Sequence, residues 1–125
     1  MSRAAVFVVA IFLGTPAWAE TAYFQQVEDL PVAPGLAEYA ERTEYSNADL
    51  RIVGASASGR ADAEHVRAYY SAALPALGWA ISLGGGGENE TVYLRGREQL
   101  SLRFFQDGDQ LRLNVLLFVR TPPSD

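Results

Sequence analysis

The most restrictive feature of the chain is the alternation of apolar and polar residues in its C-terminal half. After Trp79, apart from the glycine run 84–87, the apolar residues of each short run include every second position, a period typical of β-strands and not of helices. Asp107-Gly108-Asp109 separates two of these alternating runs, and Asp-Gly in that position is a strong hairpin signal. The pattern therefore predicts a meander of four antiparallel strands over 79–83, 91–97, 100–104 and 110–120.

A helix is expected at residues 62–77. Asp62 is a favourable N-cap, and Glu64 lies in the first turn, where the positive end of the helix dipole favours an acid. Gly78 follows the last apolar position, as is common at a helix end. Pro75 lacks a backbone donor, so we expect the last turn to kink or loosen. One apolar stripe follows the helical spacing: Val66, Tyr69, Tyr70, Ala73, Leu74 and Leu77.

Two further segments precede this helix. Thr43 and Tyr45 favour a strand, Asn47-Ala48-Asp49 offers a turn and 50–53 favours a strand again, so a hairpin is predicted within 40–59. Residues 20–36 contain prolines and no periodicity, which predicts an extended arm lying on the domain.

The order hairpin, helix and meander predicts a two-layer α+β domain. In this fold an antiparallel sheet of about five or six strands packs on one main helix. The expected division of the chain is a signal peptide at 1–19, the arm at 20–36, a single domain at 37–120 and a C-terminal tail at 121–125.

The first nineteen residues have the three parts of a secretory signal peptide. Arg3 supplies the positive charge, an apolar run extends to Leu13, and Ala17-Trp18-Ala19 forms a small-x-small cleavage site. The apolar run is shorter than the roughly 20 residues of a membrane-spanning helix, so no membrane span is expected after cleavage. The sequence thus predicts export to the periplasm as a soluble protein.

The composition excludes several kinds of site and one class of partner. The 125 residues contain no cysteine, which excludes disulfides, cysteine-based zinc sites and thiol redox chemistry. The formal net charge of -5 makes nucleic acid a poor partner, because phosphates favour basic proteins.

None of the candidate catalytic motifs has the residues and the spacing that its reaction requires. The glycine run 84–87 is followed by acidic residues and a strand, so a flexible hairpin tip is favoured over a phosphate loop. The serines within 54–59 lack the spacing of a nucleophile elbow. His65, the only histidine, lies beside Glu64 without a nucleophile or further ligands, which favours an exposed histidine over a metal or catalytic site. We therefore predict no enzyme, no metal and no cofactor.

One set of residues is a candidate binding face. If Val92, Leu94, Leu100 and the later apolar positions face the helix, alternation places arginines and aromatic residues on the opposite side. Such residues suit anionic or planar groups and are enriched at protein interfaces. Two alternatives remain open: cross-strand pairing of the arginines with Glu90 and Glu98, or coverage of the face by the arm. The candidate face comprises Tyr93, Arg95, Arg103, Phe105, Arg112 and Phe118.

A second candidate is a small-ligand pocket between helix and sheet, near Tyr69, Tyr70 and Trp79. The sequence therefore supports two functional hypotheses. The first is an interaction domain that contacts another envelope protein, and the alternative is a small-ligand carrier.

Several short motifs also carry a family resemblance. These are Asp29-Leu30-Pro31 with Pro34-Gly35, then Tyr69-Tyr70, then Leu74-Pro75 with Leu77-Gly78-Trp79. In this order they resemble a family of small exported proteins of alphaproteobacteria, over about residues 29–119. The resemblance implies a periplasmic location and no particular reaction.

Overall fold

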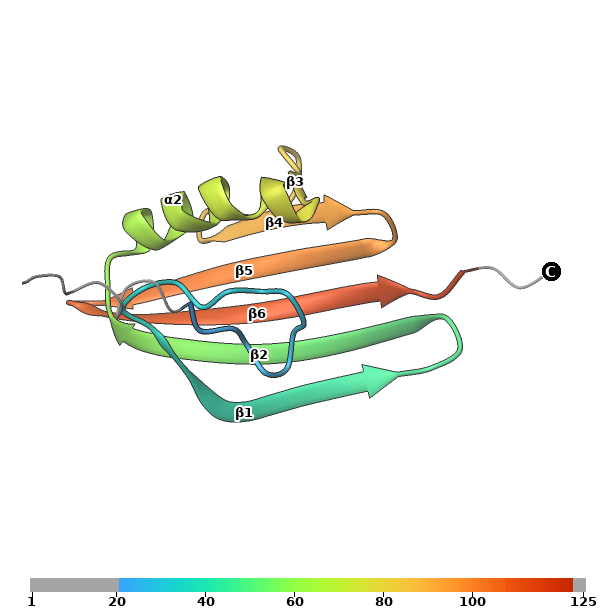
Figure 1. Ribbon diagram of the computed structural model, residues 1–125, viewed down its shortest axis with the longest axis horizontal. Coiled ribbons are helices and arrows are strands. Elements are labelled where there is room, and N and C mark those ends of the chain that lie inside the picture. The colour runs from blue at the N-terminus through green and yellow to red at the C-terminus, as the bar shows by residue number, and fades with distance from the viewer. Residues whose placement is uncertain (1–20, 123–125) are drawn as a thin grey trace, which may run out of the picture.

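The computed structural model describes residues 21–122 of the protein as one six-stranded antiparallel sheet with a single short α-helix (Figure 1). The strand order is β1-β2-β6-β5-β4-β3, so the last strand lies between the two halves of the chain. The predicted signal peptide lies outside the described residues. The elements are β1 (Ala37–Ser46), β2 (Leu50–Arg60), α2 (Ala63–Ala73), the 3-10 turn η1 (Pro75–Leu77), β3 (Ala80–Ile81), β4 (Glu90–Arg95), β5 (Glu98–Asp107) and β6 (Gln110–Arg120).

The predicted turns join the strands as expected. Asn47 Oδ1 accepts hydrogen bonds from the backbone of Asp49 and Leu50, which closes the hairpin between β1 and β2. Gly108 has a φ of 62° in the turn between β5 and β6, a conformation that glycine adopts without strain. The expected strand at 79–83 is shorter than predicted, because pairing with β4 is confined to Ala80 and Ile81.

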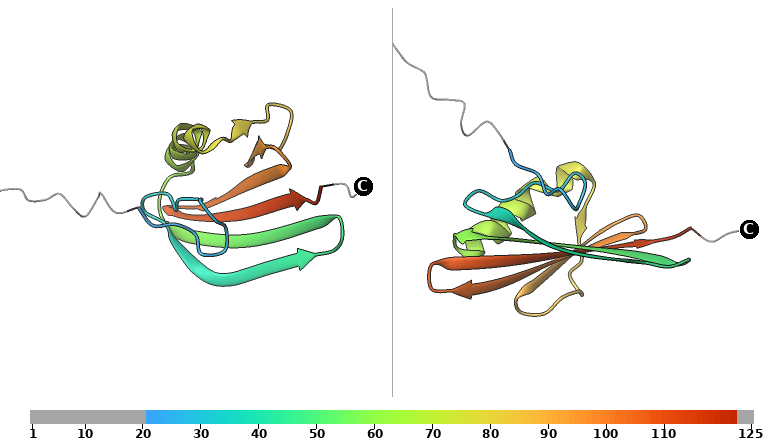
Figure 2. Two further views of the ribbon diagram at one scale, coloured as in Figure 1. Left: turned by 45° about the vertical axis from the view of Figure 1, so that its right-hand side comes forward. Right: turned by 90° about the horizontal axis from the view of Figure 1, so that it is seen from below.

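The sheet has one covered face and one largely bare face (Figure 2). Helix α2 and the N-terminal arm lie side by side on the same face, which we call the inner face. Of the segments within 21–122, only the loop that connects β3 to β4 lies against the opposite, outer face. The inner face holds the centre of the core: Leu100, Leu102, Phe104, Leu111, Leu113, Val115 and Leu117 are all buried.

The helix is a smaller part of this core than the sequence pattern predicts. It ends at Ala73, with Leu74 as the C-cap, because Pro75 cannot continue the hydrogen-bond ladder and begins a 3-10 turn. Within α2 only Val66 and Tyr70 are fully buried. The fold is therefore a sheet-dominated α+β domain, and the expectation of a sheet packed on one main helix needs correction.

The arm completes the cover that the short helix leaves open. Five of its apolar residues are buried against the sheet: Phe24, Val27, Leu30, Val32 and Ala33. Tyr70 of α2 fastens the arm, because its hydroxyl donates to the Pro31 carbonyl at 2.8 Å and accepts from the Ala33 N–H at 3.1 Å. The arm thus lies on the inner face and does not cover Phe105 and Phe118, so the alternative that the arm covers the candidate binding face is wrong.

Candidate functional site

Strand register decides which residues share the outer face. In antiparallel pairs, residues directly opposite each other point to the same side of the sheet. Phe105 lies opposite Arg112, and Gln99 lies opposite Phe118, whereas the buried Leu100 lies opposite Leu117. Four of the six residues of the predicted binding face therefore lie on the outer face: Arg103, Phe105, Arg112 and Phe118.

Tyr93 and Arg95 lie on the inner face, so their predicted placement is wrong. The turn at Gly96-Arg97 pairs Arg95 with Glu98, and this register places Tyr93 opposite the buried Leu100. Tyr93 is only 2% exposed, and burial raises its pKa above the ordinary value. Val92 and Leu94, which were expected to face the helix, point to the outer side instead.

The sequence contained a signal for this register. Residues 92–94 are all apolar, so alternation alone cannot tell which of them faces the helix. A two-residue turn at Gly96-Arg97 fixes the pairing, and counting back from it assigns Tyr93 to the side of Leu100.

Arg95 forms a structural cluster on the inner face. Its guanidinium stacks over the Trp79 ring, 4.2 Å from the centroid, while Nε donates to Glu98 at 2.7 Å. The same guanidinium donates through Nη1 to the Leu77 carbonyl at 2.9 Å. These contacts fasten the end of η1 to the sheet, so Arg95 supports the fold and is not presented to a partner on the outer face.

The loop between β3 and β4 crosses part of the outer face. Ser82 N–H donates to the Val92 carbonyl at 2.8 Å, and a Cβ added at Gly85 would lie 3.1 Å from the Val92 Cβ. This close approach explains why Val92 is only 6% exposed although it points away from the helix. The glycine run therefore allows the loop to cover one apolar position.

The uncovered part of the outer face combines an aromatic ring with arginines. Arg112 lies over the ring of Phe105, 4.7 Å from its centroid, and Phe105 is 41% exposed. Arg103 lies opposite Asn114 and contacts Glu90 at 3.7 Å, so the predicted cross-strand pairing holds for this arginine. Arg112 has no ion-pair partner among the residues whose side chains the structure describes, 21–39 and 43–122.

The structure does not bring Tyr69, Tyr70 and Trp79 into one pocket. Tyr70 is fully buried, where burial is the main reason that its pKa is raised well above the ordinary value. Tyr69 lines a shallow hollow beside His65 and Pro34. Trp79 lines a separate cleft of about 350 Å³ between the arm and the sheet.

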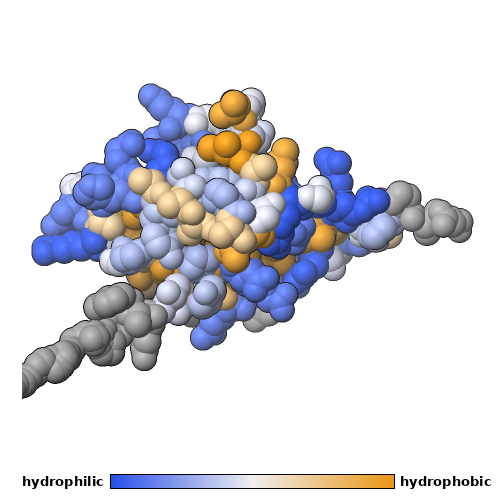
Figure 3. Space-filling view, turned by 45° about the horizontal axis from the view of Figure 1, so that its top comes forward, coloured by the Kyte–Doolittle hydropathy of each residue, from blue (hydrophilic) through white to orange (hydrophobic). Residues whose placement is uncertain are grey.

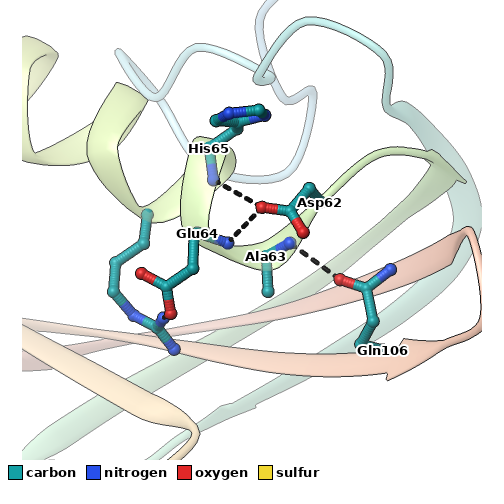
Figure 4. A network of polar contacts seen from close by, with 6 residues as sticks. Asp62, Ala63, Glu64, His65 and Gln106 are labelled. Carbon is teal, nitrogen blue, oxygen red and sulfur yellow. Dashed lines mark hydrogen bonds and ion pairs between the residues drawn. The ribbon is translucent and has the colours of Figure 1, made fainter.

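The start of α2 shows a helix cap and no catalytic pair (Figure 4). Asp62 accepts from the backbone N–H groups of Glu64 and His65 at 3.1 and 3.2 Å, while Gln106 Oε1 accepts from Ala63 N–H at 2.7 Å. The imidazole of His65 points away from both neighbouring carboxylates. The Glu64 carboxylate instead accepts from Arg67 at 2.8 Å. Gln106, which the sequence analysis did not single out, thus ties the helix to β5.

The helix side of the molecule is mostly polar at its surface (Figure 3). In Figure 3 hydrophobic residues gather at the β3 end of the view. Strand β3 and the loop after it hold two exposed apolar side chains, Ile81 at 52% and Leu83 at 92%. Within the described chain there is no group of three or more histidine, aspartate or glutamate side chains placed to hold a metal ion. The same residues include no helix long and apolar enough to cross a membrane.

Comparison of the chain with family models, with curated proteins and with solved structures found no match. The functional conclusion therefore depends on the chemistry of these surfaces.

Proposed function

We propose that this protein is an exported, non-enzymatic binding domain that contacts a protein of the bacterial envelope. The contact surface is the end of the outer face near the β5–β6 turn, formed by Arg103, Phe105 and Arg112. The observation that carries the proposal is the half-exposed Phe105 ring, held under the Arg112 guanidinium on a face that neither the helix nor the arm covers. Arginine and aromatic side chains are enriched among the residues that dominate protein interfaces.

The charges of this surface favour an acidic partner. Arg112 has its stacking contact with Phe105 but no carboxylate within the described part of the chain, so its donors are available to a partner's Asp or Glu. The Phe105 ring beside it offers apolar area to the same partner. The periplasmic location depends on the N-terminal segment and on the family resemblance.

Site-specific photo-crosslinking in the producing cell tests the proposal. A photoreactive residue at position 105 should capture one defined protein, whereas the same residue at the exposed Ala68 on the helix should not. Adding Arg112→Glu to the position-105 variant should abolish the crosslink, with an unchanged melting temperature as the control for folding. Equal capture at positions 105 and 68, or capture that survives Arg112→Glu, would contradict the proposal.

The cleft beside Trp79 favours a second candidate function, that of a small-ligand carrier. It is bounded by the arm on one side and by Leu100 and Leu117 of the sheet on the other, with Arg51 and Glu98 at its polar part. Native mass spectrometry of the protein purified from its own host should then show an added mass. A mass equal to that of the polypeptide alone would argue against the carrier.

A further inference from the structure

The far end of the outer face holds a groove that the proposed protein-binding surface does not use. Its volume is about 530 Å³. Leu50, Leu94 and Phe118 supply its apolar part, and Leu94 is 44% exposed. Arg97 and Arg120 lie at the same groove. Apolar side chains beside two cations are the combination that an amphiphilic anion requires.

The two arginines are neighbours in space. Arg120 at the end of β6 donates its backbone N–H to the Arg97 carbonyl at 3.0 Å, so the chain brings both residues to one corner of the sheet. Both are exposed, and neither forms an ion pair with a side chain that the structure describes (21–39 and 43–122). Glu98 also lines the groove, but its carboxylate already accepts a hydrogen bond from Arg95 Nε at 2.7 Å. Two exposed guanidinium groups at one corner offer charge-assisted hydrogen bonds to an anion.

The backbone around the groove favours an alkyl chain over a peptide. The groove lies over β4, β5, β6 and the start of β2, and β5 and β6 are interior strands whose neighbours pair with them on both sides. An extended peptide binds a sheet by pairing with free backbone groups at an edge strand, and these two strands offer none. An alkyl chain needs only apolar contact, which Leu94 and Phe118 provide.

We propose that this groove binds a single-chain anionic amphiphile. Its carboxylate or phosphate head accepts hydrogen bonds from Arg97 and Arg120, and its alkyl chain lies on Leu94, Phe118 and Leu50. The proposal does not depend on the protein-binding function, because the two surfaces are separate. Arg112 and Arg120 are eight residues apart along β6, which is about 26 Å at the usual rise per strand residue.

Titration of the exported protein with defined amphiphiles tests the site. Dodecanoate and dodecyl phosphate, kept below their micelle concentrations, should shift the amide signals of Leu94, Arg97 and Phe118 in a two-dimensional NMR spectrum. Acetate and inorganic phosphate carry the charge alone, and dodecyltrimethylammonium carries the chain with the opposite charge. All three should bind at least about tenfold more weakly, because each lacks either the apolar contact or the charge-assisted hydrogen bonds.

Matched variants separate this site from the rest of the outer face. The double variant Arg97→Gln/Arg120→Gln should raise the Kd for dodecanoate at least about tenfold, whereas Arg112→Gln should leave it unchanged. Leu94→Ser should weaken binding of both long-chain anions, and the NMR spectrum of each variant reports whether it is folded. Because Arg97 and Arg120 are exposed, their double variant decides the outcome even if Leu94→Ser does not fold.

Several results would overturn the proposal. Equal affinity for dodecyltrimethylammonium would mean non-specific apolar binding, and equal affinity for inorganic phosphate would mean a site for a small ion only. If Arg112→Gln raises the Kd for dodecanoate as much as the double variant does, binding would depend on the overall positive charge of the outer face and not on a site at Arg97 and Arg120. If the protein binds vesicles of phosphatidylglycerol but not free dodecyl anions, it binds an anionic membrane surface, and the groove is not a site for a single-chain amphiphile.

Discussion

At the scale of single residues, Tyr70 determines how the N-terminal segment is held. Its ring belongs to the apolar stripe of α2, as the helical spacing predicts, but its hydroxyl reaches Pro31 and Ala33 of the arm. Both arm residues are buried, so no water replaces the hydroxyl if it is lost. The aromatic pair Tyr69-Tyr70 therefore contains one structural anchor and one residue nearer the surface.

Tyr70→Phe should lower the free energy of unfolding by about 1–3 kcal/mol, because it leaves the Ala33 N–H and the Pro31 carbonyl buried without a partner. Tyr69→Phe is the matched control, since the Tyr69 hydroxyl has no hydrogen-bond partner among the side chains and backbone that the structure describes, and it should change stability by less than about 0.5 kcal/mol. Urea denaturation measures both values. Equal losses in the two variants would show that the Tyr70 hydroxyl does not fasten the arm.

Alkaline pH should weaken the same anchor. Burial raises the pKa of Tyr70 above its ordinary value of 10.0, so the folded protein resists ionisation of this hydroxyl more than the unfolded chain does. The resulting stabilisation is complete below about pH 10 and is lost as the pH rises above that value toward the folded pKa. The stability difference between the wild type and Tyr70→Phe should therefore shrink between pH 8 and pH 11, as followed by urea midpoints. A constant difference would contradict this linkage.

At the scale of elements, β2 and the arm approach each other more closely than any side chain permits. A Cβ added at Gly59 would lie 2.0 Å from the backbone oxygen of Gly35, which itself has a φ of 91°. This contact brings the end of the arm directly onto the last part of β2. It explains why the run of small residues in the second half of β2 ends in glycine.

Gly59→Ala should destabilise the fold by about 1–3 kcal/mol or more, because the backbone of the arm must move to admit the methyl group. Gly84→Ala is the control, since an added Cβ there meets no heavy atom within 4 Å, and its effect should stay within about 0.5 kcal/mol. Thermal unfolding of the two variants gives the comparison. A Gly59→Ala protein as stable as the wild type would mean that the arm does not rest on β2 at this point.

At the scale of the whole molecule, the arm and the helix together form the second layer of the domain. The helix covers one half of the inner face and the arm covers the other, and neither of them covers the outer face. Because the arm carries several buried apolar residues, its docking is part of folding and not an addition to a finished domain.

Leu30→Ala should therefore behave as a core substitution although Leu30 belongs to a segment without regular structure. Leu30 is only 2% exposed, and its truncation should lower the free energy of unfolding by about 2–5 kcal/mol. Leu83→Ala removes the same atoms from an exposed loop position and should have an effect below about 0.5 kcal/mol. Chemical denaturation measures both free energies of unfolding. If the two variants lose the same amount of stability, the arm does not form half of the second layer.

The sequence by itself determined the order of elements, the Asp62 cap, the loosened helix end at Pro75 and the two hairpin turns, because each depends on neighbours within a few residues. Alternation also placed Arg103, Phe105 and Arg112 on one side of the sheet. The two-residue turn at Gly96-Arg97 also contained the register that turns Tyr93 and Arg95 inward, although alternation alone did not reveal it. Only the tertiary structure decided that the arm lies beside the helix and that Arg97 meets Arg120. These features depend on register and on contacts between segments far apart in the chain, which a local period of two or 3.6 residues does not specify.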